Sequence, residues 1–586
     1  MKYLKLIANA VWAGLYGSIL ITLLLFFLNE DLAASGGFIA RFIRLLVPVS
    51  IVYLPLFAVL FPSLFVCVRF FAARRLGIGW LTFKAVVWFG TATLGAMCCV
   101  YYQNLRWAVS LLSPPARDAL RISLFVMTAC WILAMLAAVV AQMRPESDGP
   151  SLGAGGSGGK WRIAAASMLL VPLLVMTILL PLLALPVGRT ADAPAAISPP
   201  REGVPLTRPL VIIGLQSASM DDILPLVAAR ELPEFERLLK EGASARLDTI
   251  TPCVSGAAWV SLASGLPPWA TAVKDTNIYS IVAPPGLPPA PALGALPRSL
   301  GMGILARLGF VRSSPGAAVA QRGRPFWVRL KAAGLEVEAI QWPGSEAETS
   351  DAVAPPADDT RLSYRLGKIL GSAFGAEAPS FSEPLVTVLR GAIREDLTAR
   401  DAALSARRRQ PALGNGVLAV VFPGLGSISR YFLRYHRPAE FGEVMSQDSA
   451  WLGKVMARYY GFIDELVSEQ VGLAGPAATV MVVSAHGVEP VSTWERFAHQ
   501  LLPARDDLEP VPTGSWSRGP DGLLIIRGEG IATGAKIEDA GIVDVLPTLL
   551  YLLGVPIERD LKGTLLRRFF VREFLESHPV QLVPAR

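Results

Sequence analysis

Histidine and cysteine, which commonly act as bases, nucleophiles and metal ligands, are few in this 586-residue chain. The chain has four histidines, which are His436, His486, His499 and His578. Of its five cysteines, only Cys253 lies outside the strongly apolar N-terminal region. The C-terminal region therefore cannot form an internal disulfide and has no zinc-binding cysteine spacing. Metal or acid–base chemistry would have to rely on carboxylates and a handful of histidines.

The composition divides the chain into an apolar N-terminal region and a C-terminal region of ordinary globular composition. Hydrophobic residues make up 52% of the chain and charged residues 17%, and the apolar excess lies before about residue 188. This balance is typical of a protein with a membrane portion. The formal net charge is +7 and the pI is near 9.2. Because much of the excess Arg and Lys flanks the hydrophobic segments, a membrane explains the charge, and no nucleic-acid partner is expected.

Five stretches of the N-terminal region are long and apolar enough to span a bilayer, which takes about 20 residues. They are residues 8–28, 45–68, 83–101, 120–142 and 163–187. A cleaved signal peptide is the alternative for the first stretch, but no small-residue cleavage site follows it and four further spans do. The spans contain few ionisable residues and no acidic relay. We therefore expect a membrane anchor, residues 1–188, rather than a transporter.

Basic residues are distributed unequally among the loops between these spans. Lys2 and Lys5 precede the first span, and further Arg and Lys residues follow the second and the fourth. The loops 29–44 and 103–118 carry fewer basic residues, so the positive-inside rule places the N-terminus in the cytoplasm. With five crossings, everything after residue 187 lies outside. The prediction is a multi-pass protein of a bacterial inner membrane with a periplasmic or extracellular C-terminal domain.

The region after the spans alternates short apolar runs with helical patterns. Residues 189–208 are rich in Pro and Ala and indicate an exposed linker. A helix is expected from Asp222 to Glu241, ended by Gly242. Strands alternating with helices predict an α/β domain, residues 209–586, with a mostly parallel central sheet, in which sites form at the carboxyl ends of strands. The runs typical of buried strands are 210–215, 336–340, 417–422, 479–484 and 522–526.

One stretch of the C-terminal region does not fit this alternation. Residues 283–323 are rich in Pro and Gly and contain no run typical of a core strand. We expect them to form an insertion that lies over the edge of the sheet.

Segments of the C-terminal region resemble, in order, those of the type I phosphodiesterase/nucleotide pyrophosphatase family, which belongs to the alkaline phosphatase superfamily. VIIGLQSASMDD at 211–222 and LPEFERLLKEGASARL at 232–247 are similar to the opening of that family. TPCVSGAAWVSLASG at 251–265 is similar to its nucleophile segment. The resemblance continues through PFWVRLKAAGLEVEAIQWPG at 325–344, VVSAHG at 482–487, DGLLIIRGEG at 521–530 and IVDVLPTLLYLLG at 542–554. It implies an alkaline-phosphatase-like fold.

The resemblance also implies a two-metal site, but most of the metal-binding positions are changed in this chain. Enzymes of the superfamily hold two metal ions, usually zinc, on Asp and His side chains, and the metals activate a Ser or Thr nucleophile. The nucleophile position falls on Ser255, and the family's Asp-His pair becomes Ala485–His486. One of six metal donors survives, so we expect a degenerate member without a metal or other cofactor. The other changed positions are Gln216, Gly426, Arg430 and Ser517.

Each of the remaining site residues also has an ordinary structural explanation. Ser255 could cap a helix N-terminus, and His486 could be a relic that makes a backbone hydrogen bond. Arg430 places a cation at a family metal position, where it could hold an anionic ligand or pair with a neighbouring acid. His436 and His499 could replace lost ligands, although surface or hydrogen-bonded histidines are the commoner case.

Three functions are compatible with these residues. The first is a membrane-anchored pseudoenzyme that binds membrane lipids and an anionic headgroup, a glycan or a protein partner in the cell envelope. The second is a phosphodiesterase, phosphohydrolase or headgroup transferase with an unusual active site built on Ser255 and His486, with zinc if a metal is retained. The third is a structural subunit of a membrane complex, bound to another membrane protein. Metal content separates the first two, and co-purification of a membrane protein identifies the third.

Overall fold

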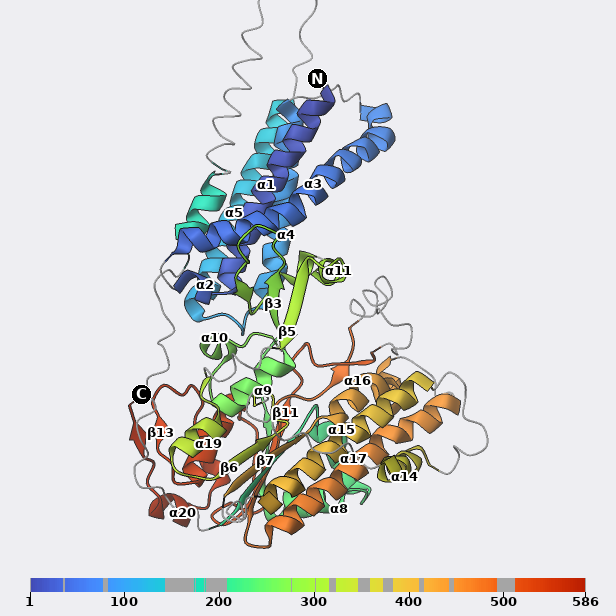
Figure 1. Cartoon of the computed structure of the whole chain (residues 1–586), viewed down its shortest axis with the longest axis vertical. Coiled ribbons are helices and arrows are strands. Elements are labelled where there is room, and N and C mark those ends of the chain that lie inside the picture. The colour runs from blue at the N-terminus through green and yellow to red at the C-terminus, as the bar shows by residue number, and fades with distance from the viewer. Residues whose placement is uncertain are drawn as a thin grey trace, which may run out of the picture. The chain divides into compact units, whose positions relative to one another are not determined.

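The chain folds into two compact units (Figure 1). Unit 1 contains Met1–Ala193 and Asn277–Pro315, and unit 2 contains Pro194–Thr276 and Gly316–Arg586, so the chain passes between the units three times. The computed structural model describes residues 2–584 except for 35–36, 77–82, 143–172, 174, 184, 186–207, 276, 301, 316–322, 346–358, 372–382, 410–415, 442–446 and 493–511. The expected linker 189–208 lies almost entirely outside the described residues.

Unit 1 is built on apolar helices. In the described residues, three helical segments are long and apolar enough to cross a membrane, namely Ile7–Leu28, Phe38–Phe57 and Pro114–Leu136. They belong to α1 (Lys2–Leu28), α3 (Phe38–Leu76) and α5 (Pro114–Gln142). The third expected span forms the helix α4 (Phe83–Trp107), which is not among the three, and most of the fifth lies outside the described residues. The structure therefore supports a membrane anchor with three candidate spans, and not the full set of five.

The segment Asn277–Pro315, called the arm below, belongs to unit 1 although its chain neighbours belong to unit 2. It contains a three-stranded antiparallel sheet in the order β4 (Ala292–Leu293), β3 (Asn277–Ile281), β5 (Val311–Pro315), and the short helix α11 (Met302–Arg307). The Asn29 side chain, just after α1, donates to Ala295 O at 2.7 Å and accepts from Ala295 N at 2.8 Å. Polar side chains at helix ends hold this Pro/Gly-rich segment to the helices of unit 1. Its expected position over the sheet edge stays a prediction.

Unit 2 is organised around a seven-stranded sheet with the order β12-β2-β11-β8-β1-β7-β6. The strands β6, β7, β1 and β8 pair in parallel, and only β11 runs against its neighbours β8 and β2. The five expected strands are confirmed to within one residue at an end, and the mostly parallel sheet is confirmed with them. The strands are β12 (Lys536–Ile537), β2 (Ala243–Leu247), β11 (Gly522–Arg527), β8 (Thr479–Ser484), β1 (Leu210–Leu215), β7 (Val417–Phe422) and β6 (Val337–Ile340).

The single helix expected from Asp222 to Glu241 is instead two helices, α7 (Met220–Ala228) and α8 (Pro233–Glu241). Arg230, between them, has a positive φ of 62°, which no helix interior adopts. Pro233 then opens α8, at a position where its missing N–H costs no hydrogen bond. The apolar periodicity continues across this break, which is why the sequence pattern alone predicted one helix.

Helices cover both faces of the sheet (Figure 1). On one face, α15 (Glu383–Arg409), α16 (Gly424–His436) and α17 (Gln447–Ala474) share a continuous apolar core with β1, β7 and β8. On the other face, α9 (Ser255–Ser264) sets Trp259 against Gly214 of β1, where a Cβ would lie 3.0 Å from the indole. The remaining elements of unit 2 include α10 (Pro268–Thr271), α13 (Phe326–Ala332), α14 (Asp359–Leu370), α19 (Val545–Leu552), α20 (Arg572–Ser577), β9 (Glu489–Pro490), β10 (Gly514–Ser515), β13 (Ile557–Glu558) and β14 (Leu582–Val583).

Candidate functional site

The candidate site lies where several connections leave the same edge of the sheet. Gln216 follows β1, His486 follows β8, and α16 begins directly after β7. These strands are parallel neighbours, so their carboxyl ends meet. Because β11 runs the opposite way, the residues that precede it, including Trp516 and Ser517, reach the same edge. One reversed strand thus adds an aromatic side chain to the site.

Ser255 and His486 form a direct contact in this site. The Ser255 Oγ lies 2.8 Å from His486 Nε2. His486 Nδ1 lies 3.0 Å from the carbonyl oxygen of Gly487, and Ser484 donates its hydroxyl to the His486 carbonyl at 2.8 Å. Ser255 is the first residue of α9, whose N-cap position is held by Val254, and no side chain caps that helix end. The Ser255 side chain therefore points to the imidazole rather than to the helix backbone.

The protonation state of His486 follows from its surroundings. The residue is fully buried, and burial lowers the pKa of its imidazole to about 4 despite the nearby Gly487 carbonyl. The ring is therefore neutral at pH 7. A proton on Nδ1, directed at Gly487 O, leaves Nε2 free to accept from the Ser255 hydroxyl. This is the geometry of a base beside a nucleophile, but an imidazole with so low a pKa is a weak base.

The indole ring of Trp516 lies between Arg430 and His486. The Arg430 Cζ is 5.4 Å from the centre of the Trp516 ring, which in turn is 5.5 Å from the centre of the His486 ring. The Arg430 Nε is buried and has no hydrogen-bond partner among the described residues. A buried N–H of a cation without a partner is costly and is normally satisfied by an acceptor, so this guanidinium is suited to receive an anion.

Gln216 and Gly426 occupy neighbouring positions in the site. A Cβ at Gly426 would lie 2.8 Å from Gln216 Cδ, so the Gln216 side chain fills the space beside this glycine. Ser217, which follows Gln216 in the chain, has a positive φ of 62°. Its buried hydroxyl has no hydrogen-bond partner among the described residues. Backbone strain of this kind is concentrated at functional sites.

The residues at the positions where the family resemblance implies metal ligands do not fit a pair of divalent ions. The side chains of Gly426 and the fully buried Ala485 have no atom that could bind a metal ion, and Arg430 places a positive charge there. Ser517 accepts a hydrogen bond from Ser515 at 3.0 Å, and its carbonyl accepts one from Cys253 N. Within the described residues, no three His, Cys, Asp or Glu side chains are grouped so that they could hold a metal ion. This donor set is unsuited to Zn²⁺, which takes several thiolate, imidazole or carboxylate ligands.

The other histidines do not join the site within the described residues. His436 contacts Asp222 at 3.5 Å and Gly453 O at 3.4 Å, and His578 contacts Ser577 and Phe574 near the C-terminus. His499 lies outside the described residues. His436 therefore does not replace a lost metal ligand in this site.

Two buried carboxylates hold α16, the helix that carries Arg430, at its two ends. At its start, Asp396 of α15 accepts from Gly424 N at 2.8 Å and from the Tyr459 hydroxyl at 2.6 Å. Burial raises the pKa of Asp396 to about 7. Sequence reasoning missed this residue, although an aspartate among the apolar positions of an amphipathic helix, between Ile393 and Leu397, is a usable signal.

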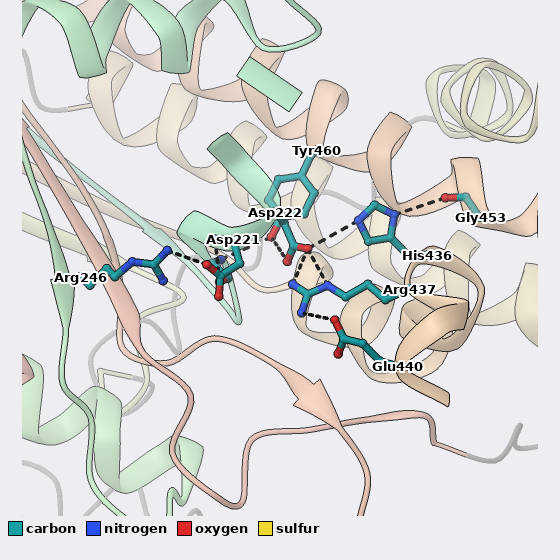
Figure 2. Close-up of polar contacts among 9 residues, drawn as sticks. Asp221, Asp222, Arg246, His436, Arg437, Glu440, Gly453 and Tyr460 are labelled. Atoms are coloured by element: carbon teal, nitrogen blue, oxygen red, sulfur yellow. Dashed lines mark hydrogen bonds and ion pairs between the residues drawn. The ribbon is translucent and has the colours of Figure 1, made fainter. Parts of the chain in front are cut away.

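At the other end of α16, Asp222 of α7 binds Arg437, His436 and Tyr460 (Figure 2). Arg437 Nε lies 3.2 Å from Asp222 Oδ1, and the Tyr460 hydroxyl lies 3.2 Å from Asp222 Oδ2. Burial by itself raises the pKa of Asp222, but the His436 hydrogen bond and the Arg437 charge outweigh it, and the pKa lies below its ordinary value. Since α7 follows β1 and Gln216 in the chain, this cluster ties the end of α16 to the segment that carries Gln216.

Comparisons with known proteins assign the region that contains this site to a family. Residues 210–538 match the family model described as type I phosphodiesterase / nucleotide pyrophosphatase. Murine ectonucleotide pyrophosphatase/phosphodiesterase 5 is similar in structure at 11% identity and a TM-score of 0.33, over 63% of this chain and 100% of that one. An inactive variant of the same murine protein in complex with AMP matches equally, with 99% of its chain covered. No curated protein sequence matches significantly. The family model covers more than half of the chain, which therefore belongs to the type I phosphodiesterase/nucleotide pyrophosphatase family of the alkaline phosphatase superfamily.

Proposed function

We propose that this chain is a membrane-anchored pseudoenzyme that binds an anionic group, on a lipid headgroup, a glycan or a protein partner, without cleaving it. The observation that carries this proposal is Arg430, a partly buried guanidinium whose Nε has no hydrogen-bond partner among the described residues. The family resemblance implies a metal ligand at this position. Its fixed positive charge would supply the anion attraction that a metal ion supplies in an active relative. The absence of metal-binding carboxylate side chains at Gln216, Gly426 and Ala485 supports the proposal that the site does not cleave its ligand with metal ions.

The proposal is tested on the full chain in nanodiscs of zwitterionic lipid. Elemental analysis should find less than one divalent ion per chain, and bis(p-nitrophenyl) phosphate should not be hydrolysed with or without added zinc. Calorimetric titration with phosphoethanolamine and glycerol phosphate should show binding, and titration with uncharged glycerol should not. Two bound ions per chain together with turnover would overturn the proposal.

A second candidate function is favoured by one observation, the 2.8 Å contact between Ser255 Oγ and His486 Nε2. It is a metal-free hydrolase or headgroup transferase in which the Ser255 oxygen attacks the phosphorus of a phosphodiester while His486 accepts the hydroxyl proton. The bond from phosphorus to one ester oxygen breaks, and His486 returns the proton to the alcohol that leaves. The low pKa of His486 works against it, because a base that is weak at neutral pH gives little help in removing a proton. A covalent adduct on Ser255, detected by mass spectrometry after incubation with a phosphodiester and absent from Ser255→Ala, would establish this alternative.

The proposed location is a bacterial inner membrane with the N-terminus in the cytoplasm and unit 2 outside. The support is the excess of basic residues in the loops assigned to the cytoplasm. A reporter that is active only in the periplasm, fused after Arg586, should be active, and a reporter that is active only in the cytoplasm should be silent there. The opposite pair of results would reverse the topology.

A further inference from the structure

The arm is fixed to the ends of two helices of unit 1 by paired polar contacts. Asn29, the residue after α1, exchanges two hydrogen bonds with the Ala295 backbone. Near the end of α4, Asn104 donates to Ser299 Oγ at 3.0 Å and accepts from Arg298 N at 3.3 Å. The Arg298 guanidinium also lies 4.6 Å from the centre of the Trp107 ring. The arm is therefore held at one end of the helical unit.

These contacts set the depth of the arm relative to a bilayer. The apolar segment Ile7–Leu28 ends one residue before Asn29, so Asn29 and the bound Ala295 lie at the boundary of the hydrocarbon layer. Trp107 lies at the end of α4, and tryptophans are enriched at this boundary. The helix α11 begins at Met302, three residues after the bound Ser299, so this part of the arm lies at the level of the lipid headgroups.

The tip of the arm exposes apolar side chains at this level. Ile304 and Leu308, four residues apart on α11 and its continuation, are 44% and 65% exposed, and Phe310 is 40% exposed. The backbone bonds Leu308 N to Ile304 O and Phe310 N to Leu305 O hold these side chains on one compact turn. Figure 1 shows α11 projecting from the arm beside the ends of the unit 1 helices. Exposed apolar groups at headgroup depth gain free energy by entering the lipid.

The charge of the arm indicates which lipid it fits. Within residues 277–315 the side chains charged at neutral pH are Arg298, Arg307 and Arg312, and the segment contains no Asp, Glu, Lys or His. Arg307 lies within the apolar turn, between Ile304 and Leu308, and Arg312 follows it; both side chains are exposed. Three positive charges without a negative one, next to an apolar tip, complement a leaflet with anionic headgroups.

We propose that the arm is an interfacial membrane anchor, in which Ile304, Leu308 and Phe310 insert between the headgroups of an anionic leaflet. Arg307 and Arg312 bind the phosphates of these headgroups. This contact is independent of the candidate anion site of unit 2. It adds a second attachment to the bilayer, made by a segment that lies between two parts of unit 2 in the sequence. Movement of the arm away from the bilayer would then break lipid contacts as well as those of Asn29 and Asn104.

The test is photo-crosslinking of the full chain in nanodiscs, with p-benzoylphenylalanine at one position at a time. Position 308 is compared with Phe125, a 76% exposed side chain on the membrane-spanning part of α5, and with Leu473, a 48% exposed leucine of unit 2. Lipid adducts at position 308 should be several-fold more abundant than at 473 and comparable with those at 125. Adding phosphatidylglycerol to phosphatidylcholine should raise the yield at 308, and the double variant Arg307→Gln/Arg312→Gln should remove that increase.

The outcomes separate lipid from other occupants of the arm tip. Adducts at 308 no more abundant than at 473 would overturn the proposal. Adducts between two copies of the chain would assign the apolar tip to self-association and overturn it as well. A yield at 308 that is high but independent of phosphatidylglycerol and of the two arginines would retain lipid insertion and overturn the preference for an anionic leaflet.

Discussion

The carboxylate of Asp396 accepts a hydrogen bond from the backbone N–H of Gly424, the first residue of the helix that carries Arg430. Asp396 is fully buried, and its pKa is raised to about 7 by burial. The folded protein therefore keeps a proton that the unfolded chain releases near pH 4. The stabilising contribution of this group is complete below pH 4 and is lost as the pH rises through about 7.

The Asp396→Asn variant should accordingly become more stable relative to the wild type as the pH rises. The pKa difference corresponds to a change of about 4 kcal/mol between pH 4 and pH 8. Thermal unfolding of both proteins in detergent at pH 5, 6, 7 and 8 would measure this difference. Asp401→Asn, which changes a partly exposed carboxylate on the same helix, is the control for removing an acidic group from α15. Parallel pH profiles for Asp396→Asn and wild type would contradict the assignment.

The Arg437→Met substitution should destabilise unit 2 strongly. It leaves the Asp222 carboxylate, whose side chain is 1% exposed, without its main cation, and breaking such a buried pair costs roughly 3–5 kcal/mol. Chemical denaturation would measure the loss. Arg572→Met is the matched control, because its partner Glu576 is exposed, and it should cost no more than about 1 kcal/mol. The double variant Asp222→Asn/Arg437→Met should recover part of the loss, and no recovery would argue against the charge as the cause.

Replacing Arg430 by Ala should weaken binding of an anionic headgroup and leave folding intact. A hydrogen bond to a charged group contributes about 1.5–3 kcal/mol, which corresponds to roughly a 10- to 150-fold loss of affinity. Calorimetry with phosphoethanolamine would measure it. Arg434→Ala removes an exposed charge one turn further along α16 and should leave the affinity within a few-fold of wild type. Equal affinities in all three proteins would remove Arg430 from the binding site.

The Ser255→Ala substitution should lower the stability of unit 2 even without any catalytic role for Ser255. It removes the partner of His486 Nε2, an acceptor in a fully buried ring, and leaving such a group unsatisfied costs about 1–3 kcal/mol. Ser255→Thr keeps the hydroxyl and should cost less. Thermal unfolding of the two variants distinguishes them. A Thr variant as unstable as the Ala variant would mean that packing, and not the hydrogen bond, is decisive at this position.

The sheet of unit 2 could be predicted closely from the sequence. Each core strand is a short apolar run between turn residues, as at Leu210–Leu215 and Val417–Phe422, and burial on both faces imposes that pattern locally. The break between α7 and α8 was missed because apolar spacing continues across Arg230, although Pro233 marks the new helix. The position of the arm could not be predicted, because it depends on contacts such as Asn29 with Ala295, 266 residues apart, which leave no local pattern.

The candidate site was predictable in its positions but not in its contacts. The resemblance to the family brought Ser255 and His486 to one place, and the structure has them in contact. Trp516, which lies between Arg430 and His486, was not singled out, because the resemblance marks its neighbour Ser517 and gives no role to an indole at position 516. Tautomer, burial and pKa at His486 depend on tertiary packing and so could not be read from residue types.

The interleaving of the two units constrains how the protein can be synthesised. The ribosome completes the helices of unit 1 before it reaches Ala295 and Ser299. Asn29 and Asn104 therefore cannot form their hydrogen bonds with these residues while residues 194–276 are synthesised. Unit 1 is complete only after the first part of unit 2, residues 194–276, has been synthesised. Unit 2 is complete only after the arm has been synthesised. Neither unit is one continuous stretch of the gene, so a chimaera that exchanges the membrane helices must exchange the arm with them. Recombination at a single crossover would join helices to an arm that they were not selected to hold.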